Sequence, residues 1–119
     1  MDIKDVYTGL GEDTERVLAR FGGNTSLLER FVRKFGEDPT YGNLMKSLED
    51  QDYPEIERGA HTLKGVAANL GFDRLSETAA AVVRAVRESK IDTIPKLSES
   101  MSEEYKKVID CIAGLDTRR

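Results

Sequence analysis

The chain has 119 residues, 39% of them hydrophobic and 34% charged, and its 18 basic and 22 acidic side chains leave a formal net charge of −4. This composition describes one charge-rich globular domain, and the lack of a basic excess argues against nucleic-acid binding. Apolar stretches are far shorter than the roughly 20 residues that a membrane span needs, so we expect no membrane insertion. One cysteine and no visible secretory signal indicate a cytoplasmic protein. One histidine excludes metal sites built on two imidazoles, and we expect no metal in this chain.

Apolar residues recur at spacings of three and four, and strict alternation is almost absent, so the sequence predicts an all-α fold. A short turn over residues 3–7 precedes helices at about residues 13–21, 24–48, 52–71, 73–88 and 92–112. Gly36, Pro39 and Gly42 are expected to kink or split the second of these helices. Because short connections favour antiparallel neighbours, we expect an antiparallel up-down four-helix bundle with short N-terminal helices as a cover. Residues 1–119 then form a single monomeric domain with its core at about 10–115.

The helix at residues 52–71 has the clearest boundaries. Asp52 is placed to cap its first amides, Pro54 lies in its first turn, and Glu55 completes a pattern like a capping box. Gly71 is its natural stop. The last helix carries a bundle seam, formed by Leu97, Met101, Tyr105, Val108, Ile112 and Leu115.

A helical wheel separates His61 from the apolar face of this helix. At about 100° per residue, one direction collects Ile56, Ala60, Leu63, Ala67 and Leu70, which predicts the core face. His61 lies about 140° from that direction. It is therefore predicted to point outward, which leaves an ordinary solvated histidine as the main alternative to a functional one.

The neighbours of His61 on the helix surface are Lys64, Gly65 and Ala68, two of which are nearly free of side-chain atoms. A glycine inside a helix costs about 1 kcal/mol relative to alanine, and access to the imidazole is the reason that fits an outward position. Lys64 lies one turn away, where it can pair with an anion at the imidazole, although a solvated surface lysine is the simpler alternative. Arg58 is a weaker candidate that could merely pair with Glu55 or Asp52.

An exposed neutral imidazole is a nucleophile that can attack phosphorus when the approach is open. Hydrolases usually add a base, an oxyanion hole and a concave pocket, none of which a helix face supplies. These observations favour a carrier of a phosphoryl group.

The same residues resemble the signature of histidine-containing phosphotransfer (HPt) domains of two-component phosphorelays. In that signature H-T-L-K-G is followed closely by A-N-x-G, and this sequence has His61-Thr62-Leu63-Lys64-Gly65 and Ala68-Asn69-Leu70-Gly71. Phe21-Gly22-Gly23-Asn24 is similar to the family's junction between its first two helices. The helix order over about residues 10–115 also fits the family.

The resemblance implies that His61 accepts a phosphoryl group from the aspartyl phosphate of a receiver domain and passes it to another receiver. It further implies phosphorylation on the ring nitrogen farther from the backbone, charge neutralisation by Lys64 and steric access at Gly65. Arg84 and Arg87 on the following helix are expected to reach the same face. Val66 departs from the family pattern, because a small or hydroxylated residue is common there.

The implied partners are response-regulator receiver domains and a hybrid sensor kinase. Magnesium is expected in the partner receiver, and this chain is expected to need no cofactor. It carries no nucleotide-binding motif, so we expect no autonomous kinase activity. Two other interpretations compete: a non-catalytic helical interaction module that retains the fold, and an unrelated enzyme or metal bundle. The second lacks the Glu-x-x-His pairs of a di-iron bundle.

Overall fold

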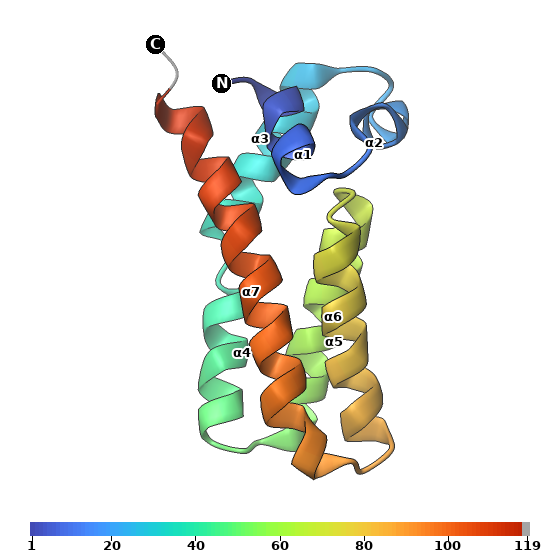
Figure 1. Cartoon of the computed structure of the whole chain (residues 1–119), viewed down its shortest axis with the longest axis vertical. Helices are drawn as coiled ribbons and strands as arrows, with labels where there is room; N and C mark the ends of the chain where they lie inside the picture. Colours follow the sequence, from blue (N-terminus) through green and yellow to red (C-terminus); the bar gives the residue numbers. More distant parts are fainter. Residues whose placement is uncertain (118–119) are drawn as a thin grey trace.

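The structure is a computed structural model that describes residues 1–117, and all of its regular elements are helices (Figure 1). In chain order these are α1 (Ile3–Leu10), α2 (Thr14–Arg20), α3 (Thr25–Glu37), α4 (Thr40–Glu49), α5 (Tyr53–Asn69), α6 (Asp73–Arg87), the 3-10 helix η1 (Ile91–Thr93), α7 (Ile94–Ala113) and the 3-10 helix η2 (Gly114–Thr117). The all-α prediction is confirmed. None of the described helices is long and apolar enough to cross a membrane.

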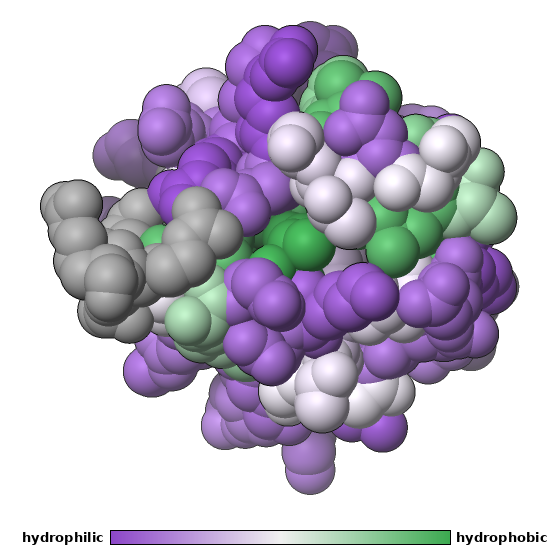
Figure 2. Space-filling view, turned by 90° about the horizontal axis from the view of Figure 1, so that it is seen from above, coloured by the Kyte–Doolittle hydropathy of each residue, from purple (hydrophilic) through white to green (hydrophobic). Residues whose placement is uncertain are grey.

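Helices α4, α5, α6 and α7 run alternately down and up as the predicted bundle, and α3 continues the line of α4 (Figure 1). Helices α1 and α2 lie over one end of the bundle, where the N-terminus and the end of α7 are also found (Figure 1). Seen from above, this end shows mostly hydrophilic side chains around smaller apolar areas (Figure 2). The short N-terminal helices therefore form the predicted cover, and the turn expected at residues 3–7 is a full helix.

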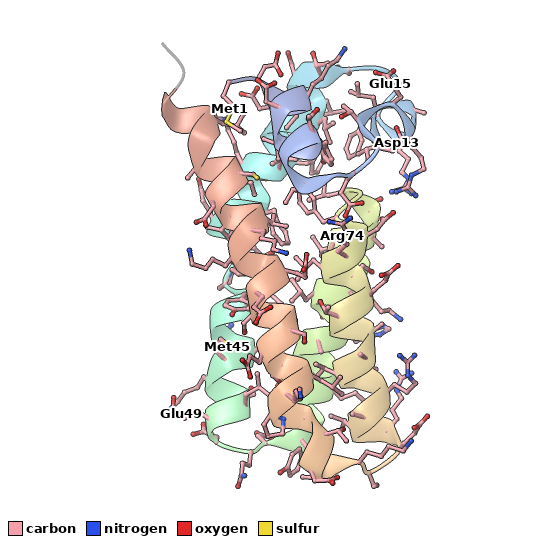
Figure 3. The ribbon with its side chains drawn as sticks, in the orientation of Figure 1. Met1, Asp13, Glu15, Met45, Glu49 and Arg74 are labelled. Atoms are coloured by element: carbon pink, nitrogen blue, oxygen red, sulfur yellow. The ribbon has the colours of Figure 1, made fainter. Side chains whose placement is uncertain are left out.

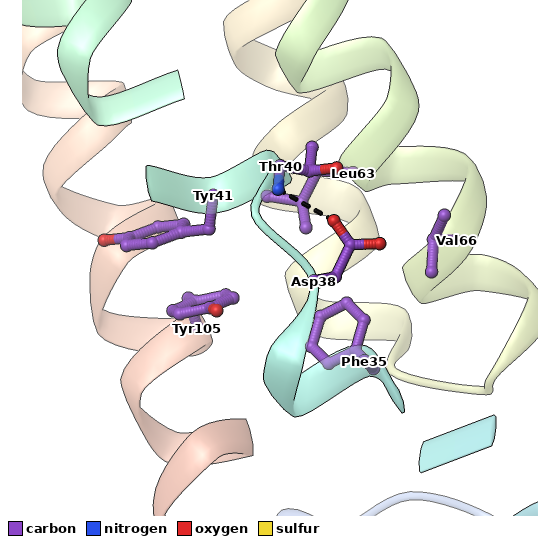
Figure 4. A pocket seen from close by; sticks show the side chains of 7 residues that line it. All are labelled: Phe35, Asp38, Thr40, Tyr41, Leu63, Val66 and Tyr105. Atoms are coloured by element: carbon purple, nitrogen blue, oxygen red, sulfur yellow. Dashed lines mark hydrogen bonds between the residues drawn. The ribbon is translucent and has the colours of Figure 1, made fainter. Parts of the chain in front are cut away.

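The predicted break in the second long helix lies at one point, between α3 and α4. Asp38 and Pro39 separate the two helices, and the Asp38 carboxylate accepts a hydrogen bond of 2.7 Å from the Thr40 amide (Figure 4). The helix is therefore split within the predicted stretch, at Asp38 and Pro39, while Gly36 lies in the last turn of α3 and Gly42 in the first turn of α4. A Cβ at Gly36 would stand 3.4 Å from Ile112 Cγ2, so this glycine permits close packing against α7.

Helix α5 begins and ends where the sequence predicts. The Asp52 side chain accepts from the Glu55 amide at 3.4 Å, while the Asp52 amide donates to the Ser47 carbonyl at 3.0 Å. Only half of the capping box therefore forms, because its second donor is already occupied. After the last turn, Gly71 adopts a φ of +77°, which glycine tolerates better than other residues.

Hydrogen bonds join the N-terminal cover to the turn between α5 and α6, and side chains from both of these parts take part in them. Figure 3 shows Arg74 at the start of α6, beneath the cover. The contacts, with their lengths, are Tyr7 hydroxyl to Leu70 carbonyl (2.6 Å), Arg20 guanidinium to the carbonyls of Ala68 (2.7 Å) and Asn69 (3.1 Å), Arg74 amide to Glu12 carboxylate (3.1 Å) and Arg74 guanidinium to Leu10 carbonyl (3.4 Å). They orient the end of α5 and the start of α6.

The core lies where the apolar patterns predict. All five wheel residues of α5 are buried, and so are Met101, Val108, Ile112 and Leu115 of the predicted seam. Leu97 and Tyr105 are half-buried, and Leu115 lies in η2, beyond the end of α7. The core thus leaves the opposite side of α5 open to solvent.

Candidate functional site

His61 lies on the exposed side of α5, as the wheel predicts. Its neighbours Ala60 and Leu63 are buried, so the helix turns His61 away from the core. Within residues 1–117 the imidazole makes no hydrogen bond or ion pair. The ring is therefore accessible to a reacting partner.

The surface beside His61 is open at Gly65. A Cβ added to Gly65 would find no atom within 4 Å, whereas one added to Gly59 would stand 3.3 Å from Leu44 Cδ1. Gly59 therefore serves packing against α4, and Gly65 does not. Ala68, one turn further along, is also exposed, which extends the small-residue surface.

Helix α6 flanks His61 on one side, and two contacts fix its register. The Ser76 hydroxyl donates to the Lys64 carbonyl at 3.0 Å, and Arg87 Nε donates to Glu57 Oε2 at 2.8 Å. Because α5 and α6 are antiparallel, His61 lies opposite the part of α6 between Ser76 and Arg87. Arg84 is an exposed residue of that part.

The basic candidates near His61 differ in their partners. Arg58 pairs with Glu55 on its own helix at 3.3 Å, and Arg87 pairs with Glu57. Lys64 and Arg84 make no side-chain ion pair within the described part of the chain. Lys64, one turn from His61 on α5, and Arg84 on the neighbouring α6 are thus cations without an ion-pair partner in residues 1–117.

An apolar groove lies beside Gly65, between α5 and α3. Its volume is about 410 Å³, and its lining comprises Phe31, Lys34, Phe35, Asp38, Gly65, Val66, Asn69 and Leu70. Phe31 is 43% exposed, which is unusual for so large an apolar side chain. Apolar spacing alone places Phe31 with the other apolar residues of its helix and does not predict the groove. On a wheel it lies at the edge of the buried set Leu28, Val32 and Phe35, and this position was a usable signal.

The sequence model of the family described as "Hpt domain" matches residues 26–116 of this chain. No curated protein and no solved structure was found to match. The chain belongs to the Hpt domain family. Hpt domains take part in phosphorelay histidine phosphotransfer with receiver domains. Helices α1 and α2 precede the matched residues, so the cover described above lies outside the part of the chain that defines the Hpt domain.

One wall of the groove in this Hpt domain also encloses a small cavity of about 10 Å³ (Figure 4). Phe35, Asp38 and Val66 line both spaces. On the far side of the cavity, the rings of Tyr41 and Tyr105 stack with centroids 3.6 Å apart. Burial is the main cause that raises the pKa of Tyr105.

Proposed function

We propose that this Hpt domain carries a phosphoryl group on His61, taken from the aspartyl phosphate of one receiver domain and passed to another. The observation that supports it best is the exposed imidazole beside the open surface at Gly65. A folded receiver domain can approach such a convex, uncrowded helix face, which a small buried pocket would not allow.

The transfer itself needs few groups from this chain. The lone pair of His61 Nε2 forms the N–P bond while the aspartyl oxygen of the receiver keeps the electrons of the breaking O–P bond. Nδ1 retains its proton, so the phosphorylated ring carries the positive charge. Transfer in the opposite direction reverses these changes, which suits an intermediate carrier.

Lys64 and Arg84 are proposed to neutralise charge on the phosphoryl oxygens. Neither has an ion-pair partner within the described residues, so neither must give one up when an anion arrives. Phosphoryl transfer depends mainly on positioning and charge stabilisation. Magnesium and the acidic pocket are expected in the receiver. Arg58, already paired with Glu55, is a weaker candidate.

The groove beside Gly65 is proposed as part of the surface that contacts the receiver. Gly65 belongs to the groove and lies one turn from His61, so a receiver that reaches the imidazole also covers this groove. Phe31 supplies exposed apolar area, and Lys34 supplies a positive charge at the rim. An acidic receiver surface would be complementary to that charge.

The biological setting follows from this role. Response regulators and a hybrid sensor kinase are the proposed sources of the receiver domains. We propose that the chain acts in the cytoplasm as a monomer, because each site is complete within one chain. It needs no nucleotide of its own.

Incubation with a receiver domain that has been phosphorylated by acetyl phosphate tests the proposal. Phosphorus NMR of the wild-type chain should show a phosphoramidate signal, and His61→Gln should show none. His61→Gln should keep the wild-type melting temperature, because the exposed side chain leaves no core cavity.

The groove alone would also suit an interaction module that binds partners without phosphoryl transfer. If wild-type chain binds receivers yet takes up no phosphoryl group from them or from phosphoramidate, that second function is the correct one. A phosphohistidine signal in wild type and not in His61→Gln excludes it.

A further inference from the structure

Glu57 is the acidic residue of α5 within one turn of His61, and its carboxylate is held by another helix. Residues four apart on a helix have Cβ atoms about 5–6 Å apart, so a glutamate at position 57 can reach an imidazole at position 61. Instead, Glu57 Oε2 accepts a hydrogen bond of 2.8 Å from Arg87 Nε on α6. The contact is a charge-assisted hydrogen bond, the stronger class of such bonds.

We propose that Arg87 is a positioning residue that holds the Glu57 carboxylate away from His61. This inference rests on the proposed role of His61 as the phosphoryl carrier. It gives Arg87 a different role from direct contact with the phosphoryl group, because its guanidinium is already engaged one turn from the imidazole.

A released carboxylate would act on His61 in two ways. It would favour the protonated imidazole, which has no lone pair for attack on phosphorus. It would also stabilise the positive ring of the phosphorylated form, which would slow release of the phosphoryl group. A carrier must accept and release with comparable ease, and the Arg87–Glu57 pair removes both effects.

Other charged groups surround the exposed side of α5, and most of them are cationic. Helix α4 has no charged side chain from Thr40 to Met45, and its Tyr41 stacks on Tyr105. The remaining groups are Glu55, Arg58 and Lys64 on α5, Glu77 and Arg84 on α6, Lys34 on α3, Asp38 in the α3–α4 link, and Arg20 of α2 at the end of α5. Glu57 is the carboxylate that shares a helix turn with His61.

Proton NMR of the full, unphosphorylated chain tests this role, because the single histidine gives unambiguous imidazole signals. In Arg87→Gln, the midpoint of the imidazole titration should rise by about 0.3 pH units relative to wild type, the size expected for a helical pair at this spacing. In the Glu57→Gln background, the same Arg87→Gln change should move the midpoint by less than half as much. Arg87→Lys should stay close to wild type.

Lys106→Gln is the matched control, since it breaks a comparable exposed pair with Asp110 on α7 (3.1 Å) and should leave the midpoint unchanged. Equal shifts with and without Glu57, or no shift in Arg87→Gln, would overturn the proposal. The first result would mean that Arg87 acts through its own charge, and the second that the pair only fastens α5 to α6.

Phosphoryl release provides a second readout. After phosphorylation by phosphoramidate, Arg87→Gln should pass its phosphoryl group to a receiver about twofold more slowly than wild type, and the double variant should recover. Faster or unchanged release in Arg87→Gln would contradict the proposal. Failure of wild type to become phosphorylated would refute the proposed function alone, since the titration does not depend on phosphorylation.

Discussion

Lys64 is half-buried one helical turn from His61 and makes no ion pair within residues 1–117. Its position on the helix lets the ammonium group reach the surface beside the imidazole, and no carboxylate within residues 1–117 pairs with it. In the proposed function, this cation acts through charge-assisted hydrogen bonds to an incoming phosphoryl group rather than through the fold. The two contributions can be separated by measuring transfer and stability on the same variant.

Lys64→Ala should slow phosphoryl transfer from a receiver by about ten- to a hundredfold, which corresponds to the loss of one charge-assisted hydrogen bond. The free energy of unfolding should change by no more than about 0.5 kcal/mol. Rapid-mixing transfer assays and urea unfolding check the two effects. Lys64→Arg should restore the rate in part, because its planar group has a different reach. Lys96→Ala, an exposed change on α7, is the control, and a wild-type rate in Lys64→Ala would make Lys64 an ordinary surface lysine.

Gly65 is expected to lower the stability of α5 while it keeps the approach to His61 open. Gly65→Ala should raise the free energy of unfolding by about 0.5–1 kcal/mol, because alanine favours the helix and the added Cβ meets open space. Gly65→Leu should keep the fold and slow transfer, because its side chain would crowd the approach to His61. Gly42, in α4, also faces open space, so Gly42→Ala should match the gain in stability. Transfer by Gly65→Leu at the wild-type rate would refute the access argument.

At the scale of elements, the turn between α5 and α6 joins the site to the N-terminal cover. Gly71 combines a positive φ with direct packing against Val17 of α2, and Arg20 of the same helix binds the last carbonyls of α5. A guanidinium at this end of a helix is also favourable for the helix dipole. The orientation of α5, and with it the face that carries His61, therefore depends on α2.

Gly71→Ala should lower the free energy of unfolding by about 2 kcal/mol or more. Alanine is strained at this φ, and its Cβ would overlap with Val17 Cγ2. Urea unfolding measures the loss, and Gly65→Ala, inside α5, provides a glycine substitution with the opposite expected sign. A neutral Gly71→Ala would mean that α2 can move away from the turn without cost.

At the scale of the whole molecule, long-range contacts join the cover to the bundle. Tyr7 is buried, stacks on Phe72 with ring centroids 5.5 Å apart and donates to the Leu70 carbonyl. Arg16 of α2 also pairs with Asp73 at the start of α6. We expect residues 1–119 to unfold as one cooperative unit, because α1 and α2 bury their apolar side chains in the same core.

Alkaline pH should lower the free energy of unfolding through the ionisation of Tyr7. Burial is the main cause that raises the pKa of Tyr7 above the ordinary tyrosine value near 10. Above about pH 10 the unfolded chain loses this proton while the folded chain keeps it, so the stability is full below that pH and falls as the pH rises. Tyr7→Phe should make the fall between about pH 9 and pH 11 shallower.

Urea unfolding across that pH range checks this prediction, with Tyr53→Phe as the control. At neutral pH, Tyr7→Phe should cost about 1 kcal/mol for the lost hydrogen bond to Leu70. An unchanged pH profile in Tyr7→Phe would assign the alkaline loss to other groups, among them Tyr105, whose pKa is also raised by burial.

The sequence alone was sufficient to predict most of the helices and the outward position of His61. Apolar spacing, the Asp52 cap and Gly71 predict the extent of α5, because these signals act within a few residues of each other. The wheel predicts the exposure of His61 for the same reason. The roles of His61, Lys64 and Gly65 remain predictions that rest on this geometry and on the family.

Only the tertiary structure decided how distant segments meet. The hydrogen bonds of Arg87, Tyr7 and Arg20 join residues that are 30 to 63 positions apart. The groove beside Phe31 is likewise lined by residues of different helices. Helical periodicity says which side of a helix is buried but not which neighbour covers it, because that depends on the rotation and register of packed helices. The sequence therefore determined which face of α5 is exposed and carries His61, and the packing of α2, α3 and α6 against α5 determined the surroundings of that face.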